Sequence, residues 1–184
     1  VGNHIAERVH TDRPPPCKKA ELNQEIIAIE SMKTDIILAG VGGQGILSIA
    51  TILGAAALSD NLYLKQAEVH GMSQRGGDVM SCLRLSSSPI ASDLIPQGKA
   101  RYIQWLSPQG WIVTNTVPMV NITSYPPMED ITGALDATGR VVSFDMDEVA
   151  KEVASARASN MVLLGAAAPM IDIPVDKIEN AIRE

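Results

Sequence analysis

Cysteine is scarce in this sequence, with only Cys17 and Cys82 among 184 residues. The two are far apart and form no Cys-x-x-Cys pair, so we interpret both as free thiols in a reducing compartment. Two thiols are too few for a [4Fe–4S] cluster, which needs four cysteine ligands. The sequence therefore predicts that this chain holds no such cluster by itself.

Positive charge and long apolar runs are also in short supply. Lys and Arg number 15 against 21 Asp and Glu, which gives a net charge of -6 and excludes the basic face that nucleic-acid binding requires. The longest apolar stretch, Ile46 to Leu58, is interrupted by Gly54 and is too short to cross a bilayer. No apolar secretory segment opens the chain. We expect a cytoplasmic protein without nucleic-acid or membrane partners.

The first 31 residues differ from the remainder. They carry a Pro14–Pro16 run and mixed charges, and an abrupt strand pattern follows Met32. We interpret residues 1–31 as a poorly ordered upstream extension or linker, and Met32 as the natural start. Residues 32–184 are expected to form one domain, because the 46% hydrophobic content is sufficient for one core.

From Lys33 onward, short apolar runs alternate with helical periods, which is typical of an α/β fold. Ile36–Ala39 is rich in β-branched residues and ends at glycine, so it predicts a buried parallel strand. Further strands are predicted at 62–69, 78–85, 111–113 and 141–144, and helices over 46–57, from Met146, and after Pro174. The predicted fold is a single-domain, Rossmann-like, mainly parallel sheet with helices on both faces.

A glycine loop lies between the first strand and the first helix, and it consists of Gly40, Val41, Gly42, Gly43, Gln44 and Gly45. We expect Gly40 to permit the tight turn, Gly42 to let the backbone approach an anion, and Gly45 to let helix and strand pack closely. The helix start would offer N–H groups and partial positive charge to a phosphate or carboxylate. A purely structural turn is the alternative. No Lys-Ser/Thr pair follows Gly45, so a Walker-type nucleotide loop is excluded.

A nicotinamide dehydrogenase is one function that this loop could serve. Such an enzyme uses an acidic residue about 20 positions further on to hold the ribose hydroxyls, and Glu68 lies near that place. The stretch after Glu68 is not the plain helix that a dinucleotide-binding half-domain would have next. The dehydrogenase therefore remains an alternative.

A second glycine-containing loop follows the second predicted strand, with Ser73, Gln74, Arg75, Gly76 and Gly77 before Asp78. Arg75 could recognise a carboxylate or phosphate, because its guanidinium donates in a fixed fork and the glycines keep the backbone close. An ion pair with a neighbouring subunit is an equally weighted alternative. His70 is interpreted first as a structural hydrogen-bonding residue, although it could titrate near neutral pH.

The two loops together resemble the gamma domain of pyruvate- and 2-oxoacid:ferredoxin oxidoreductases, and within that family most of all the indolepyruvate ferredoxin oxidoreductase subunit beta. Further agreement comes from residues 95–100, from Val113–Thr116 at a strand end, and from residues 155–166. The likeness covers about residues 32–184. Asn115 and Thr116 join the residues of the two loops as candidates for contact with an anion, coenzyme A or another subunit.

The resemblance implies an accessory subunit that is inactive alone. The reaction would oxidise a 2-oxoacid, with indolepyruvate or another aryl pyruvate as substrate, and with coenzyme A as cosubstrate, to acyl-CoA, CO2 and reduced ferredoxin. Thiamine diphosphate, Mg2+ and [4Fe–4S] clusters would lie on a large partner subunit. No catalytic or metal-binding residue is predicted here, because the nearest Asp and Asn to a thiamine motif, Asp78 and Asn115, are too widely spaced. A hetero-oligomer is expected, or a homodimer when the chain is isolated.

One departure from the family pattern lies near residues 100 and 101. Family members usually carry an apolar strand and a helix there, whereas Ala100 meets Arg101 directly in this chain. We expect a strand with its crossover helix to be missing. A non-catalytic binding or assembly module is a third possible function of such a chain.

Overall fold

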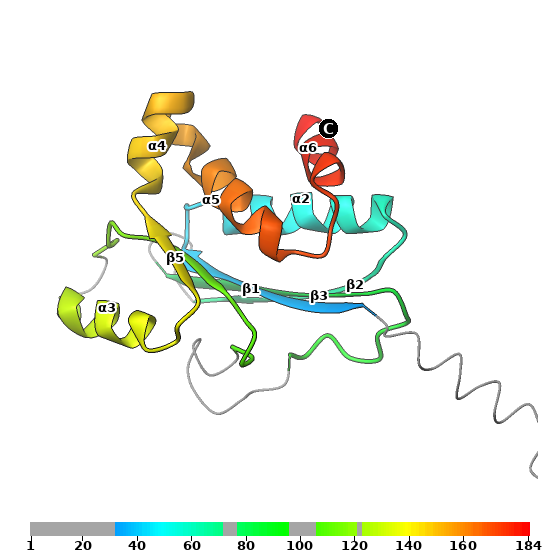
Figure 1. The fold of residues 1–184 in the computed structure, drawn as a ribbon, viewed down its shortest axis with the longest axis horizontal. Coiled ribbons are helices and arrows are strands. Elements are labelled where there is room, and N and C mark those ends of the chain that lie inside the picture. The colour runs from blue at the N-terminus through cyan, green and yellow to red at the C-terminus, as the bar shows by residue number, and fades with distance from the viewer. Residues whose placement is uncertain (1–31, 72–76, 96–105, 121–122) are drawn as a thin grey trace, which may run out of the picture. The chain divides into compact units, whose positions relative to one another are not determined.

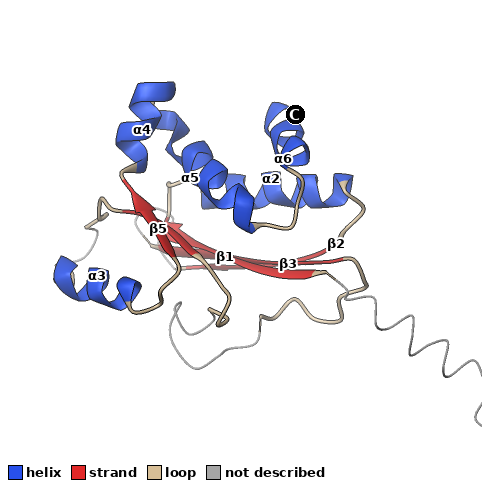
Figure 2. Cartoon of the chain, viewed as in Figure 1, coloured by secondary structure: helices blue, strands red, loops and turns tan. Residues whose placement is uncertain are grey.

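The computed structural model describes residues 32–71, 77–95, 106–120 and 123–184. The described residues form a mixture of strands and helices, with three strands following one another before β4 ends and three α-helices at the end of the chain (Figures 1 and 2). The strands are β1 (Lys33–Val41), β2 (Tyr63–His70), β3 (Asp78–Ser86), β4 (Ile112–Asn115) and β5 (Val141–Phe144). The α-helices are α2 (Ile46–Ser59), α3 (Met128–Asp136), α4 (Met146–Val153), α5 (Ser159–Ala167) and α6 (Val175–Arg183). Short 3-10 turns lie at Ala156–Ala158 and Ala168–Met170.

The strands form two sheets rather than one mainly parallel sheet. β1, β3 and β2 lie in that order and are antiparallel to their neighbours, whereas β4 and β5 are parallel. The α/β class and the single domain are confirmed, but the prediction of a mainly parallel sheet is wrong for the described strands. The connection from His70 to Asp78 is too short for a crossover helix, so β3 returns antiparallel and lies between β1 and β2.

The prediction of a buried parallel strand at Ile36–Ala39 is also corrected. β1 is an edge strand of the three-stranded sheet, and its apolar residues are half-buried while Ala39 is exposed. The apolar run Ile36–Ala39 was compatible with the middle of a parallel sheet, but it lies in an edge strand that pairs antiparallel with β3. The pattern of apolar residues identifies a strand, but it does not determine which strands lie beside that strand in the sheet.

Helix α2 forms the centre of the hydrophobic core. It is apolar nearly all round, and it packs on all three strands of the larger sheet and against α5 and α6. Leu53 on α2 and Leu83 and Leu85 on β3 are almost fully buried. Gly54 lets β2 approach closely, because an added Cβ would lie 3.2 Å from Leu64 Cδ2. Helix α2 is therefore buried on more than one side, and the helix predicted over 46–57 is confirmed.

Helices cover the two sheets unequally. Helices α2, α5 and α6 lie on the same face of the three-stranded sheet, whereas α3 lies on the opposite side of the β4–β5 pair from α5 (Figure 1). On the other face of the larger sheet, the buried Arg84 on β3 pairs with Asp35 on β1 at 2.8 Å. Arg84 also donates to the backbone carbonyls of Ser92 and Leu94. This arginine therefore fixes the segment that follows β3 against the sheet.

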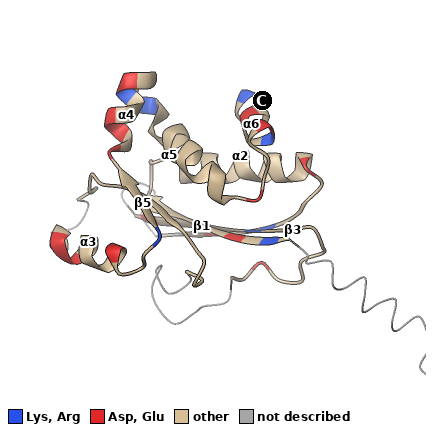
Figure 3. Cartoon of the chain, viewed as in Figure 1, with Lys and Arg blue, Asp and Glu red and all other residues tan. Residues whose placement is uncertain are grey.

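The predicted helices from Met146 and after Pro174 are confirmed as α4 and α6. The side chain of Asp145 caps α4 by accepting from the N–H groups of Asp147 and Glu148. Helices α3 and α5 were not predicted. No helix of the described residues is long and apolar enough to span a membrane. Acidic residues gather on α3 and at the start of α4 (Figure 3).

Candidate functional site

The first glycine loop is held by hydrogen bonds at both of its ends. The N–H of Val41 donates to Gln44 Oε1 at 2.7 Å, and the N–H of Gln44 donates back to the Val41 carbonyl at 3.1 Å. The N–H of Gly42 donates to the carbonyl of Gly77 at 2.8 Å. Gln44 therefore closes the loop on itself, and Gly42 joins it to the end of the second loop.

The glycines of this loop have different physical roles from those that the sequence suggested. The left-handed backbone lies at Gly43, with φ 100°, and at Gly45, with φ 74°, so the turn depends on these two residues and not on Gly40. Gly40 is needed for close packing, because an added Cβ would lie 2.7 Å from Gln44 Oε1 and 2.8 Å from Ile46 Cδ1. An added Cβ at Gly45 would collide with the Asn160 side chain of α5.

The start of α2 retains N–H groups that can donate to a ligand. Gly45 is the N-cap residue and makes no side-chain cap hydrogen bond, and the first turn contains no acidic residue. Within the described part of the chain, no acceptor is found for the N–H of Gly43 or of Ile46. These donors and the helix dipole favour an anionic group at this position.

The second loop ends beside the first. It connects β2 to β3, and its base is closed by the N–H of Gly71, which donates to the Asp78 carbonyl at 2.7 Å. Gly77 meets Gly42, so the two predicted loops come together at the carboxyl end of β1. Ser73, Gln74, Arg75 and Gly76 lie outside the described residues, as does the His70 side chain, and their roles remain predictions.

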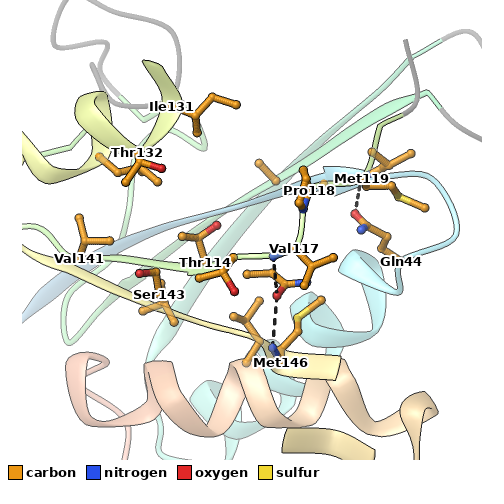
Figure 4. Close-up of a pocket in the computed structure, with 18 of the residues that line it drawn as sticks. Gln44, Thr114, Val117, Pro118, Met119, Ile131, Thr132, Val141, Ser143 and Met146 are labelled. Carbon is orange, nitrogen blue, oxygen red and sulfur yellow. Dashed lines mark hydrogen bonds between the residues drawn. The ribbon is translucent and has the colours of Figure 1, made fainter. Parts of the chain in front are cut away.

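Asn115 and Thr116 lie at the carboxyl end of β4, close to the first loop. Asn115 Oδ1 accepts from the N–H groups of Val117 and Met146, each at 3.2 Å, and so joins β4 to the start of α4 (Figure 4). Thr116 is exposed, and its N–H donates to the Phe144 carbonyl of β5 at 3.0 Å. The side-chain oxygen of Asn115 is therefore engaged in holding the site, while Thr116 is open to a partner.

A depression of about 490 Å³ lies at the carboxyl ends of these strands. It is lined by Gly43, Gln44, Asn115, Val117, Pro118, Met119, Met146, Asp147, Arg157, Ser159 and Asn160. The structure thus brings the first loop together with Asn115 and with the start of α5. Gly40 and Thr116 do not line this depression, although both line the neighbouring groove between β1 and β4.

Arg157 and Asn160 were missed as candidate site residues. Both belong to the stretch 155–166 that contributed to the family resemblance, which was the only available signal, since neither lies near a glycine motif in sequence. Arg157 is exposed and makes no ion pair within the part of the chain that the structure describes. Asp147, the carboxylate of the depression, accepts a 2.5 Å hydrogen bond from the Ser159 hydroxyl. Arg157 is therefore the cation that the described lining of this depression offers to an anionic ligand.

The arrangement does not support the nicotinamide dehydrogenase alternative. In that fold the second strand lies beside the first, so that its terminal acid reaches the ribose. Here β3 lies between β1 and β2, and Glu68 on β2 accepts from Gln66 at 2.6 Å. The acidic residue is thus two strands away from the glycine loop.

Metal-ligating side chains do not gather in the described residues, where no group of three or more His, Cys, Asp or Glu is found. Cys82 on β3 is a free, half-buried thiol. Burial, and next the negative charge of Asp35, raise the pKa of Cys82 above its ordinary value. A raised pKa keeps the thiol protonated and unreactive, so Cys82 has the character of a structural residue.

Curated relatives match most of the chain. "Indolepyruvate oxidoreductase subunit IorB" of Pyrococcus horikoshii is 32% identical over 171 aligned positions, covering 81% of this chain and 84% of the relative. The subunit of the same name from Archaeoglobus fulgidus is 32% identical, covering 83% and 86%. Since 81% of 184 residues is about 149, about 22 of the 171 positions in the first match have no residue in this chain.

Solved structures and a family model agree with these relatives. The pyruvate oxidoreductase subunit PORC of Thermotoga maritima has a TM-score of 0.57 at 17% identity, covering 82% of this chain and 84% of that one. The keto/oxoacid ferredoxin oxidoreductase gamma subunit of Geobacter sulfurreducens has a TM-score of 0.58 at 22% identity, covering 82% and 83%. The model described as pyruvate ferredoxin/flavodoxin oxidoreductase matches residues 35–184. The chain therefore belongs to the pyruvate ferredoxin/flavodoxin oxidoreductase family.

Proposed function

We propose that this chain is the accessory subunit of a thiamine-dependent indolepyruvate:ferredoxin oxidoreductase. Its substrate would be indolepyruvate or another aryl pyruvate, and its products acyl-CoA, CO2 and reduced ferredoxin. The names of the relatives from Pyrococcus horikoshii and Archaeoglobus fulgidus support this substrate. The proposal includes a cytoplasmic hetero-oligomer, a location that suits two widely separated thiols.

One observation carries the proposal. The hydrogen bond from Gly42 to Gly77 brings the two glycine loops together beside the start of α2. The open N–H groups of that helix start and the exposed Arg157 lie at the same edge of the molecule. Donors and a cation gathered in this way favour an anionic group, which is the chemistry of coenzyme A or of a carboxylate on the large subunit.

The assignment of the cofactors to the large subunit follows from the residues that this chain contains and lacks. A [4Fe–4S] cluster needs four thiolates, and the whole chain has two cysteines, so the clusters, thiamine diphosphate and Mg2+ are assigned to the large subunit. When bound there, thiamine diphosphate would stabilise the carbanion of the 2-oxoacid. The proposed contribution of this chain is to bind and orient an anionic group through Gly43, Arg157 and the start of α2.

The test compares two exposed arginines in the complex with the large subunit. Arg157→Gln removes the cation of the depression, whereas Arg183→Gln removes a cation of α6 whose side chain is 71% exposed and remote from the loops. If coenzyme A is the ligand, Arg157→Gln should raise the coenzyme A half-saturation by roughly fivefold or more, without changing assembly. If the ligand is a carboxylate of the large subunit, the same change should weaken assembly.

Arg183→Gln should alter neither quantity. Equal behaviour of the two variants would contradict the assignment of this edge as the anion-facing site. It would leave the chain's family membership unaffected.

A further inference from the structure

One edge of β1 carries peptide groups beside which the described part of the chain places no strand. Neighbouring residues of an antiparallel strand turn their N–H and C=O groups to opposite edges. The carbonyl of Met32 accepts from Ser87 and the N–H of Gly42 donates to Gly77, so the even-numbered residues face β3. Val41, which donates to Gln44 Oε1, faces the other way. Ala39 therefore presents its N–H and C=O to the open edge.

The strand β4 has an open edge of the same kind. The N–H of Ile112 donates to the Arg140 carbonyl at 2.9 Å and that of Thr116 to the Phe144 carbonyl at 3.0 Å. The even-numbered residues of β4 therefore face β5. Val113 and Asn115 turn their peptide groups away from β5, and no further strand lies beside them in the described residues.

A groove of about 430 Å³ separates these two open edges (Figure 4). Ala39–Val41 line one side and Val113–Asn115 the other. Beyond the strands, Leu163 of α5 lines it together with the α3 residues Met128, Ile131 and Leu135. Because α5 and α3 lie on opposite sides of the β4–β5 pair, the groove is covered from both faces (Figure 1).

The two strands that border the groove point in the same direction. Gln44, just after β1, and Asn115, at the end of β4, both line the depression at the carboxyl ends, whereas Ala39 and Val113 line only the groove. A strand parallel to both would therefore find N–H and C=O groups on each side. Its alternate side chains would face α5 and α3, as in an inner strand that is apolar on both faces.

We propose that this groove is a binding site for one additional parallel β-strand, and that its occupant is an extended, uncharged, valine- and isoleucine-rich segment of a partner polypeptide. The lining is mostly apolar, and its one charged residue in the described part of the chain is Asp136, at the end of α3. About 22 positions of the match with the Pyrococcus relative have no residue here, enough for a strand and most of a crossover. No strand of the described residues lies in the groove, and we therefore assign its occupant to another polypeptide. With it, the two sheets become one mixed sheet through β-strand addition.

The test uses the 184-residue chain and a fluorescent synthetic peptide, a valine- and isoleucine-rich hexapeptide with two lysines appended for solubility. Saturable binding is expected by anisotropy. A second peptide with N-methyl groups on alternate residues keeps the apolar side chains but loses its donors toward one neighbouring strand. It should bind at least about fivefold more weakly.

Two protein variants locate the site. Ala39→Pro removes an open-edge N–H at an exposed residue of the groove, and should weaken binding by at least about fivefold. Lys33→Pro removes an N–H of the same edge at the start of β1, outside the groove, and should leave binding unchanged.

Three results would overturn the proposal: no saturable binding, equal binding of both peptides, or a dimer in sedimentation that Ala39→Pro dissociates. The last would make a second copy of this chain the occupant. If Ala39→Pro fails to fold, the two peptides still decide the question. None of these results depends on coenzyme A or on the large subunit, so failure here is separate from failure of the proposed function.

Discussion

The close approach of Gly45 to Asn160 gives a quantitative prediction for the candidate site. Gly45→Ala places a side chain on a left-handed backbone, φ 74°, which costs roughly 1–2 kcal/mol. The added Cβ also collides with the amide nitrogen of Asn160, which must move. Gly43→Ala is the matched control, because Gly43 is left-handed as well, φ 100°, but an added Cβ meets nothing within 4 Å.

A double-mutant cycle with Asn160→Ala separates the two contributions. Removing the Asn160 side chain should recover about 1 kcal/mol of the free energy of unfolding lost in Gly45→Ala, since residues in contact couple by that order. The same removal should be additive with Gly43→Ala to within about 0.5 kcal/mol. The free energies come from urea unfolding of the 184-residue chain, with the midpoint shift read at constant slope. Equal coupling in both cycles would refute the packing of the loop against α5.

Three further predictions concern the sheet and the site. Asn115→Ala should lower the free energy of unfolding by about 1–2 kcal/mol, because two backbone N–H groups lose their acceptor. Asn115→Asp keeps the acceptor and should lose less; equal losses would contradict this role. Asp35→Ala should cost about 3 kcal/mol by leaving the Arg84 side chain, 6% exposed, as a buried cation. Arg84→Met should cost less, because the Asp35 side chain is 28% exposed and can reach water; the reverse order would be inconsistent with the burial. The Cys82 thiol has a raised folded pKa, so its contribution to stability is present below its ordinary pKa of 9.0 and is lost as the pH rises through the folded value. In a Cys17→Ala background, the thermal midpoint should therefore fall more steeply above pH 9.0 than in a variant that also carries Cys82→Ala, and parallel curves would argue against the raised pKa.

Local structure was the part of the fold that the sequence predicted well. The helix from Ile46 was predicted because its apolar residues are nearly continuous, α4 because apolar residues recur at helical spacing, and α6 because Pro174 suits the first turn of a helix. Helix α3 was missed: none of its residues is buried, and its apolar residues Met128, Ile131 and Leu135 form only a short stripe. A helix that packs against a core has an apolar face, and the recurrence of apolar residues on that face is what identifies a helix in a sequence. An exposed helix has a weaker pattern of this kind.

Strand order was beyond what the sequence could predict. The period of a strand states which residues share a face but not which strand lies alongside, so β3 could not be placed between β1 and β2. Glu68 has the sequence distance from the glycine loop that a ribose contact requires, so the sequence suggested that role. Its strand β2 does not lie beside β1, and this could not be seen from the sequence.

The candidate site was predicted in part. The glycine loops were identified because glycine is required where the backbone is left-handed or closely approached, and Gly43, Gly45 and Gly40 meet those conditions. Arg157 and Asn160 could not be assigned, because they reach the same edge only through the packing of α5 beside α2. Residues that meet through tertiary packing leave no spacing signal in the chain.

Reconstitution of activity tests the central claim most directly. The purified chain is mixed with the proposed large subunit, which would carry thiamine diphosphate and the clusters, and the reduction of ferredoxin is measured with indolepyruvate and coenzyme A. We predict that neither chain alone reduces ferredoxin, that the equimolar mixture does, and that omission of coenzyme A abolishes the reaction. Full activity of the large subunit without this chain, or indolepyruvate oxidation by this chain alone, would contradict the account.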